Sequence, residues 1–245
     1  MTSPIPSSWD VPQIFRDRLG ATLGRQRAMV ADQHLLLILH DVPNPETPAI
    51  RSAHVYWRAP DGRWRTTAGR GSTAAILRDH QEPFAKLADR LEDKVEKAQT
   101  AEDYFKVIYA ATPALRTIRH TLRVLQEARD TIKADRDLIS VRDSAQELER
   151  ALELIHDYAK DGLEFMSARN AEESARNSEK VNRSSHQLNM LMALFLPITA
   201  FGSILGINMR HGLEEWHAPI TFWGVCGVSL LLGYWIRSRL PKPDR

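Results

Sequence analysis

Two long apolar runs near the end of the chain constrain its fold more than any other feature. They are LNMLMALFLPITAFGSILGINM at residues 188–209 and APITFWGVCGVSLLLGYWI at 218–236, and neither contains Asp, Glu, Lys or Arg. Each is about as long as a helix needs to cross ~30 Å of hydrocarbon. The sequence therefore predicts a two-helix membrane hairpin behind a charged region. Two helices cannot enclose a pore, so the hairpin is either an anchor or one part of an oligomeric channel.

The average composition hides this division. Charged residues make up 26% of the chain, the formal net charge is +2 and the mean hydropathy is −0.37. The single cysteine, Cys226, lies inside the second apolar run, which excludes a disulfide framework. No phosphate-binding loop and no nucleophile motif is visible. We therefore expect no enzymatic activity, no cofactor and no nucleic-acid partner.

The distribution of positive charge predicts the orientation of the hairpin. Basic residues precede the first run and follow the second, whereas the connecting loop has only Arg210. The positive-inside rule then places both termini in the cytoplasm. Trp216 at one end of the hairpin and Trp235 at the other lie at the depths of aromatic belts. We expect an integral protein of a membrane such as the bacterial inner (plasma) membrane.

The region before the hairpin is predicted to begin as a small α+β part. Strands are expected at Leu35–Leu39, His54–Arg58 and Arg63–Thr67, the last two joined by the turn Ala59–Gly62. This part is too small to bury a large core by itself. We expect four divisions along the chain: a loop-rich α+β region at 1–71, cytoplasmic helices at 72–142, a stalk helix at 143–187, and a transmembrane region with a basic tail at 188–245.

Helical periodicity dominates after residue 72. A first helix is expected at 74–98, and Thr100 with Asp103 predicts the cap of a short helix that ends near Ala110. Thr112-Pro113 predicts the start of a further helix, and a turn is expected at 138–140.

The stalk and the first apolar run are predicted to form one helix. No proline interrupts residues 143–196, so 143–208 can form a helix roughly 100 Å long. Residues 167–185 are almost without large apolar side chains. A helix that is polar all round is either solvated or lines a wet channel.

A polar stripe enters the first apolar run. At 100° per residue, one sector about 100° wide contains Asn182, Ser185, Asn189, Met192, Leu196, Thr199 and Ser203. A lone Ser or Thr in a span usually stabilises packing between helices. A continuous polar stripe instead suits a pore wall when several copies surround an axis. Neutral oxygens suit a hydrated cation, because magnesium gives up its water reluctantly. Leu196 and Leu188 would form apolar constrictions.

The segment Phe195–Thr199, followed by Gly206-Ile207-Asn208, resembles the CorA-type divalent cation transporters. These have an FxPxT segment and a Gly-Met-Asn signature before a short loop, and the resemblance covers about residues 143–245. It implies a mainly α membrane protein that forms a homopentamer, with a pore made from five first spans. It also implies an outer selectivity site at Gly206, Ile207 and Asn208. An ungapped count matches four residues to pore-facing positions, namely Asn182, Leu188, Leu196 and Thr199. The basic residues Arg237, Arg239 and Lys242 resemble the positive ring around the inner pore mouth.

The sequence departs from the family pattern in three places. Ile207 replaces the signature methionine, and the loop is different, although Glu214 and Glu215 would still concentrate cations near the mouth. The histidines His211 and His217 suggest zinc, but a solvated loop is the favoured interpretation. The N-terminal region is shorter than in the family, so its metal-sensing sites have only the stalk candidates Asp143, Glu147 and Glu149.

The sequence thus predicts a passive divalent cation channel or transporter, with Mg²⁺ as the leading ion. The inside-negative potential, ~2.3 kcal/mol per charge per 100 mV, would drive the ion inward. One alternative is a transporter of zinc or another transition metal. Another is a non-conducting, membrane-anchored scaffold, and a third is a channel that has lost gating by cytoplasmic metal.

Overall fold

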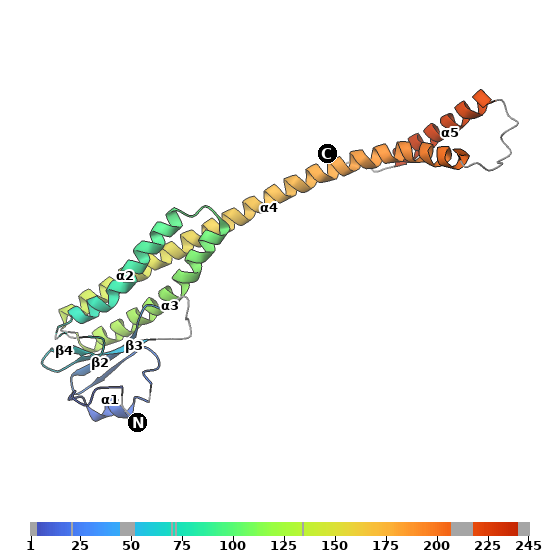
Figure 1. The fold of residues 1–245 in the computed structure, drawn as a ribbon. Helices are drawn as coiled ribbons and strands as arrows, with labels where there is room; N and C mark the ends of the chain where they lie inside the picture. Colours follow the sequence, from blue (N-terminus) through green and yellow to red (C-terminus); the bar gives the residue numbers. More distant parts are fainter. Residues whose placement is uncertain are drawn as a thin grey trace. The chain divides into compact units, whose positions relative to one another are not determined.

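The computed structural model describes residues 4–20, 22–44, 52–69, 71, 73–133, 135–206 and 218–239. The protein is mainly helical, with one small antiparallel sheet and one long helix, as predicted (Figure 1). Its elements, in chain order, are α1 (Gln13–Asp17), β1 (Arg27–Ala31), β2 (His34–His40), β3 (Ala53–Arg58), β4 (Trp64–Thr66), α2 (Ala75–Glu96), α3 (Ala101–Thr131), α4 (Arg136–Gly206) and α5 (Ala218–Arg239). The chain divides into two compact units, residues 1–167 and 168–245, and α4 contributes to both.

The sheet of the first unit has the strand order β1-β2-β3-β4, with every neighbouring pair antiparallel. The three predicted strands are confirmed as β2, β3 and β4. Strand β1 is not predicted from its sequence, because the two-residue loop that joins it to β2 is Asp32-Gln33. Both residues adopt left-handed backbone angles, with φ of 48° and 64°, without the glycine that usually marks such a hairpin.

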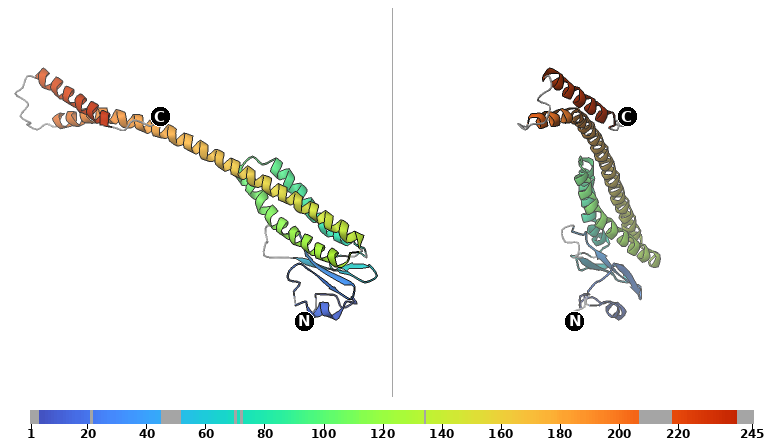
Figure 2. Two further views of the ribbon diagram at one scale, coloured as in Figure 1. Left: turned by 180° about the vertical axis from the view of Figure 1, so that it is seen from behind. Right: turned by 90° about the vertical axis from the view of Figure 1, so that its right-hand side faces the viewer.

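Both faces of the sheet are covered, which explains the unbroken apolar run of β2. Alternate side chains of a strand point to opposite faces. Leu35, Leu37 and Leu39 belong to the core shared with the helices, whereas Leu36 and Ile38 pack in a second cluster with the N-terminal segment. Figure 2 shows α1 on one side of the sheet and the helices on the other. The small α+β part therefore completes its core with the helices that follow it.

Helix α3 differs from the prediction of two helices meeting at Thr112-Pro113. It is continuous from Ala101 to Thr131, with Pro113 inside it. A proline removes one backbone hydrogen bond of a helix and usually breaks or kinks it. Here the buried residues Ala111 and Ala114 flank Pro113, and packing in the core keeps the helix continuous through the proline. The predicted cap at Thr100 is confirmed, since its side chain and that of Asp103 form a reciprocal capping box.

The turn before α4 also differs from the prediction. Helix α3 ends at Thr131 and α4 begins at Arg136, so residues 138–140 are helical, with Leu138 fully buried in the helical core. Asp135 accepts hydrogen bonds from the backbone N–H groups of Asp137 and Leu138, which caps the new helix. Its other carboxylate oxygen lies 2.6 Å from Nε of Arg58 on β3, and this pair ties the helix start to the sheet.

Helix α4 runs without a break from residue 136 to 206, which confirms the predicted long helix as far as the described residues reach. Its first part buries Val141, Ala145 and Leu152 in the core of the first unit. Gly162 lies against the ring of Tyr104 on α3, where any Cβ would clash. Every residue from 167 to 185 is exposed.

Candidate functional site

The predicted pore-lining side of α4 is exposed throughout the second unit. Three large apolar members of this set, Leu188, Met192 and Leu196, are 56–58% exposed. The complete set of exposed positions is Asn182, Ser185, Leu188, Asn189, Met192, Leu196, Thr199 and Ser203. A single chain thus leaves these positions open to solvent or to another molecule.

A different side of α4 is covered. Pro197 is buried, and Met190 and Ala193 are half-buried, which at 100° per residue places them on one face beside the exposed stripe. On α5 the covered positions likewise share one face and include the buried residues Ser229 and Gly233. These two faces belong to the same unit, and Figure 1 shows α5 returning beside the end of α4. The covered face of α4 thus lies beside the stripe and leaves the stripe open.

Polar groups on the stripe present neutral oxygen and nitrogen atoms. The hydroxyl of Thr199 donates a hydrogen bond to the carbonyl of Leu196 at 2.9 Å. Its proton is thus held by the helix, while its lone pairs remain available to accept hydrogen bonds. Asn182, Ser185 and Asn189 can accept and donate from the same side. Such a surface can bind water molecules and, through them, a hydrated ion.

The ends of the two helices hold the other predicted site residues. Gly206 is the last residue of α4, and Arg237 and Arg239 lie in the last turn of α5. The remaining positions of the predicted site lie outside the described residues, namely Ile207, Asn208, Glu214, Glu215 and Lys242, together with His211 and His217.

The three candidate acids of the stalk do not converge. Asp143 lies 2.9 Å from Arg142, and Glu149 accepts a hydrogen bond of 2.9 Å from Arg119, whereas Glu147 has no ion-pair partner among the described residues. In the described part of the chain, no group of three or more His, Cys, Asp or Glu side chains is placed to hold a metal ion.

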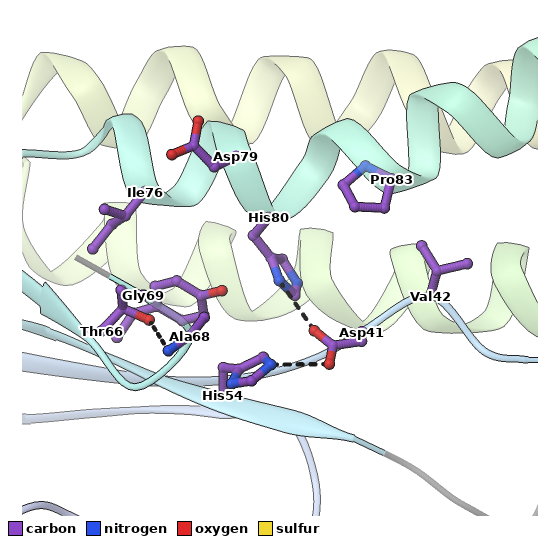
Figure 3. Close-up of a pocket in the computed structure, with 11 residues that line it drawn as sticks. Asp41, Val42, His54, Thr66, Ala68, Gly69, Ile76, Asp79, His80 and Pro83 are labelled. Carbon is purple, nitrogen blue, oxygen red and sulfur yellow. Dashed lines mark hydrogen bonds and ion pairs between the residues drawn. The ribbon is translucent and has the colours of Figure 1, made fainter. Parts of the chain in front are cut away.

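The first unit contains a cavity between the sheet and α2 that the sequence does not predict. It encloses about 420 Å³, and its polar lining includes Asp41 and the histidines His54 and His80 (Figure 3). Asp41 lies between the two rings: Nε2 of His54 is 3.0 Å from one carboxylate oxygen, and Nδ1 of His80 is 3.7 Å from the other. These residues come from the ends of β2 and β3 and from α2, so only the fold brings them together.

Burial controls the charge of the cavity. Desolvation lowers the pKa of His80 to about 4, against the raising effect of Asp41, so its imidazole is neutral at pH 7. Desolvation and the charge of Asp41 raise the pKa of Tyr56, which keeps its phenol protonated. Nε2 of His80 is buried and has no hydrogen-bond partner among the described residues. Two aromatic groups of the cavity, His80 and Tyr56, are therefore uncharged at pH 7.

Among the described residues, none of the helices combines the length and the apolarity needed to cross a membrane.

The chain is similar to known proteins in sequence and in fold. The family model described as "CorA-like Mg2+ transporter protein" matches residues 74–239. The full-length CmaX protein has a similar structure, with a TM-score of 0.50 and 18% identity over 94% of this chain and 83% of that chain. The CorA magnesium transporter of Methanocaldococcus jannaschii gives a TM-score of 0.42 and 14% identity over 89% of this chain and 79% of that one. A search of curated protein sequences finds no match.

Proposed function

We propose that this chain, which belongs to the CorA-like Mg²⁺ transporter family, transports Mg²⁺ through a pore lined by the stripe on α4. The matched region begins at residue 74 and therefore includes α2 and α3 as well as the long helix and α5. The observation that carries the proposal is the exposed row of polar side chains on one side of α4.

The pore requires several copies in a membrane. The apolar runs at 188–209 and 218–236 are the proposed spans, with both termini on the cytoplasmic side. Five copies of α4 around an axis would place the stripe on the pore wall, and α5 would lie outside as a brace facing lipid. The large side chains of α5 support this arrangement, since Trp223 and Leu231 are both 71% exposed.

The chemistry of the stripe suits an ion that keeps its water. Mg²⁺ releases its hydration shell reluctantly, so a wall of neutral acceptors can pass the ion by hydrogen-bonding its waters. Carboxylates would bind the ion more tightly, and the stripe has none from 182 to 203. Leu188 and Leu196 interrupt the polar row and would act as apolar gates that close by losing water. The membrane potential, ~2.3 kcal/mol per charge per 100 mV, is the driving force.

Selectivity is proposed to reside at Asn208 with Gly206 and Ile207, the positions that match the family signature. The acids Glu214 and Glu215 would raise the local cation concentration at the outer mouth. At the inner mouth, Arg237, Arg239 and Lys242 would form a basic ring around the pore.

The proposal is tested by Mg²⁺ uptake into proteoliposomes under an inside-negative potential. The variant Asn208→Ala should lose most of the uptake while keeping the oligomeric size of the wild type, because it removes the proposed selectivity ring. The matched control is Leu191→Ala, an exposed position on the opposite side of α4, which should retain uptake. Undiminished uptake by Asn208→Ala would contradict the pore assignment.

The same assay distinguishes Mg²⁺ from other divalent ions and a transporter from a non-conducting scaffold. Competition by Zn²⁺, Co²⁺ and Ni²⁺ at equal concentration should reduce Mg²⁺ uptake only weakly. Preferential uptake of Zn²⁺ would identify Zn²⁺ instead of Mg²⁺ as the transported ion. Absence of any cation flux from a correctly oriented oligomer would favour a membrane-anchored scaffold.

A further inference from the structure

Exposed large apolar side chains of the first unit gather on two helices. Apart from Ile14 on α1, which is 41% exposed, all of them lie on α3 or α4. They are Phe105, Tyr109, Leu154, Tyr158 and Phe165, each at least 52% exposed. Scattered apolar residues are normal on a protein surface, but a concentration of this kind marks an interaction site.

On each helix these residues form a narrow stripe, and charged residues extend the stripe along the same side of the helix. At 100° per residue, the α3 stripe spans only ~40° of the helix circumference and contains Phe105, Tyr109, Arg116 and Arg123. The α4 stripe spans a sector of the same width, ~40°, and contains Glu147, Leu154, Tyr158 and Phe165. Arg116, Arg123 and Glu147 are exposed and have no ion-pair partner among the described residues.

The two stripes do not cover each other within one chain. Tyr104 faces α4 at Gly162, and Phe105 stands ~100° further around α3. On α4, Tyr158 stands ~40° from Gly162, so the α4 stripe borders the side that meets α3. All members of both stripes are still exposed in the single chain, which leaves them open to another molecule.

The stripes are nevertheless level along the helix pair. The antiparallel register is fixed by Tyr104 against Gly162, and by Arg119, which reaches Glu149 and Glu153. Counting from these contacts puts Phe105 level with Phe165, Tyr109 level with Tyr158, and Arg123 level with Glu147. Rotation about an axis parallel to these helices preserves height, so the members of each level pair lie at the same height in neighbouring copies.

We propose that the α3 stripe of one copy binds the α4 stripe of the next, in a head-to-tail contact between first units. Aromatic side chains would pack against apolar ones at one end, and Arg123 would pair with Glu147 at the other. Because the two surfaces are different, repetition of the contact does not stop at a pair, and it forms a ring when the rotation between copies closes. The inference rests on the proposed function, since a pore made from two spans per chain needs several copies.

Cysteine cross-linking tests the contact, because Cys226 is the only native cysteine and can be replaced by serine. The variant Tyr109→Cys with Tyr158→Cys, in the full chain in detergent, should give a ladder of covalent oligomers under mild oxidation. Each single cysteine variant should give no ladder. The matched control is Ile14→Cys with Tyr158→Cys, which should remain uncross-linked.

The outcomes of the cross-linking experiment distinguish failure of this contact from failure of the proposed transport function. An oligomer of unchanged size that gives no ladder overturns the contact and leaves the proposed transport standing. Cross-linked dimers from a single cysteine variant also overturn it, since they indicate a self-complementary contact. A monomer that transports no cation overturns both.

A charge exchange provides a second test that needs no cross-link. Arg123→Glu or Glu147→Arg alone should raise the dissociation constant of the oligomer about tenfold, and the combined variant should restore it to within about threefold. Glu92→Arg, at an exposed position on α2, is the control and should change nothing. Failure of the combined variant to restore association would overturn the pairing.

Discussion

The two units of the chain differ in the exposure of their large apolar side chains. In the first unit Leu37 and Phe84 are fully buried, and both faces of the sheet are covered by segments of the same chain. In the second unit Phe195 and Leu231 are more than half exposed, although this unit contains both apolar runs. The first unit is thus complete by itself over most of its surface, whereas the second exposes large apolar side chains, which in the proposed channel would contact lipid or another copy. A substitution that weakens folding should act in the first unit, and its counterpart in the second should not.

The largest contrast is expected between two phenylalanines. Phe84→Ala removes a ring with no solvent exposure and should lower the free energy of unfolding by about 4 kcal/mol. Phe195→Ala, at a site 55% exposed, should change the unfolding of the first unit by less than about 0.5 kcal/mol. Urea unfolding of the full chain in detergent, followed by tryptophan fluorescence, to which the buried Trp57 and Trp64 of the first unit contribute, measures both. Equal losses would remove the distinction between the units.

Acid should weaken the first unit through His80. Its pKa is about 4 in the folded protein and near 6.5 in the unfolded chain, so the unfolded state binds the proton more readily. Stability is therefore full above pH 6.5 and falls as the pH drops toward 4, by up to ~3 kcal/mol. The difference in unfolding free energy between wild type and His80→Gln, measured from pH 7.5 to 4, isolates this effect. A difference that does not change with pH would contradict it.

Two glycines of α4 extend the comparison between the two units to the helix backbone. A Cβ at Gly162 would clash with the ring of Tyr104, so Gly162→Ala should lower stability by about 2 kcal/mol despite the better helix propensity of alanine. Gly202 has open space around it, so Gly202→Ala should be neutral or slightly stabilising. Thermal unfolding of the two variants gives the comparison directly.

The smallest effect is expected at the start of α3. Thr100→Ala removes one half of the capping box and should lower stability by about 1 kcal/mol. Arg183→Ala breaks an exposed ion pair with Glu179 in the second unit, which should cost less than about 0.5 kcal/mol. Denaturant midpoints resolve the two if the slopes of the transitions are unchanged.

Periodic patterns predicted the elements but not all of their ends. The α2 helix, the capping box at Thr100 and the long α4 helix follow from local residues alone. The continuity of α3 through Pro113 and the start of α4 at Arg136 do not, because packing around Ala111, Ala114 and Leu138 overrides the local signals. Strand β1 was not predicted from the sequence, because its hairpin loop is Asp32-Gln33, which adopts left-handed conformations without a glycine.

The candidate sites show the same division between local and distant information. The stripe on α4 is a property of one helix, so its members can be counted from the sequence, and the structure leaves that face exposed. The cavity at Asp41, His54 and His80 joins residues from two strands and a helix, and no spacing in the sequence relates them. The level pairs between α3 and α4 depend on the register set by Tyr104 and Gly162, which also requires the fold.

Thiol accessibility tests most directly whether the stripe on α4 faces water in the assembled protein. In a Cys226→Ser background reconstituted into liposomes, Thr199→Cys and Leu191→Cys place one thiol on the stripe and one on the opposite side of the helix. We expect a membrane-impermeant, water-soluble thiol reagent to modify Thr199→Cys and to block its Mg²⁺ uptake, while Leu191→Cys stays unmodified and active. Modification of Leu191→Cys with protection of Thr199→Cys would contradict a pore wall at the stripe, because the stripe would then face protein or lipid.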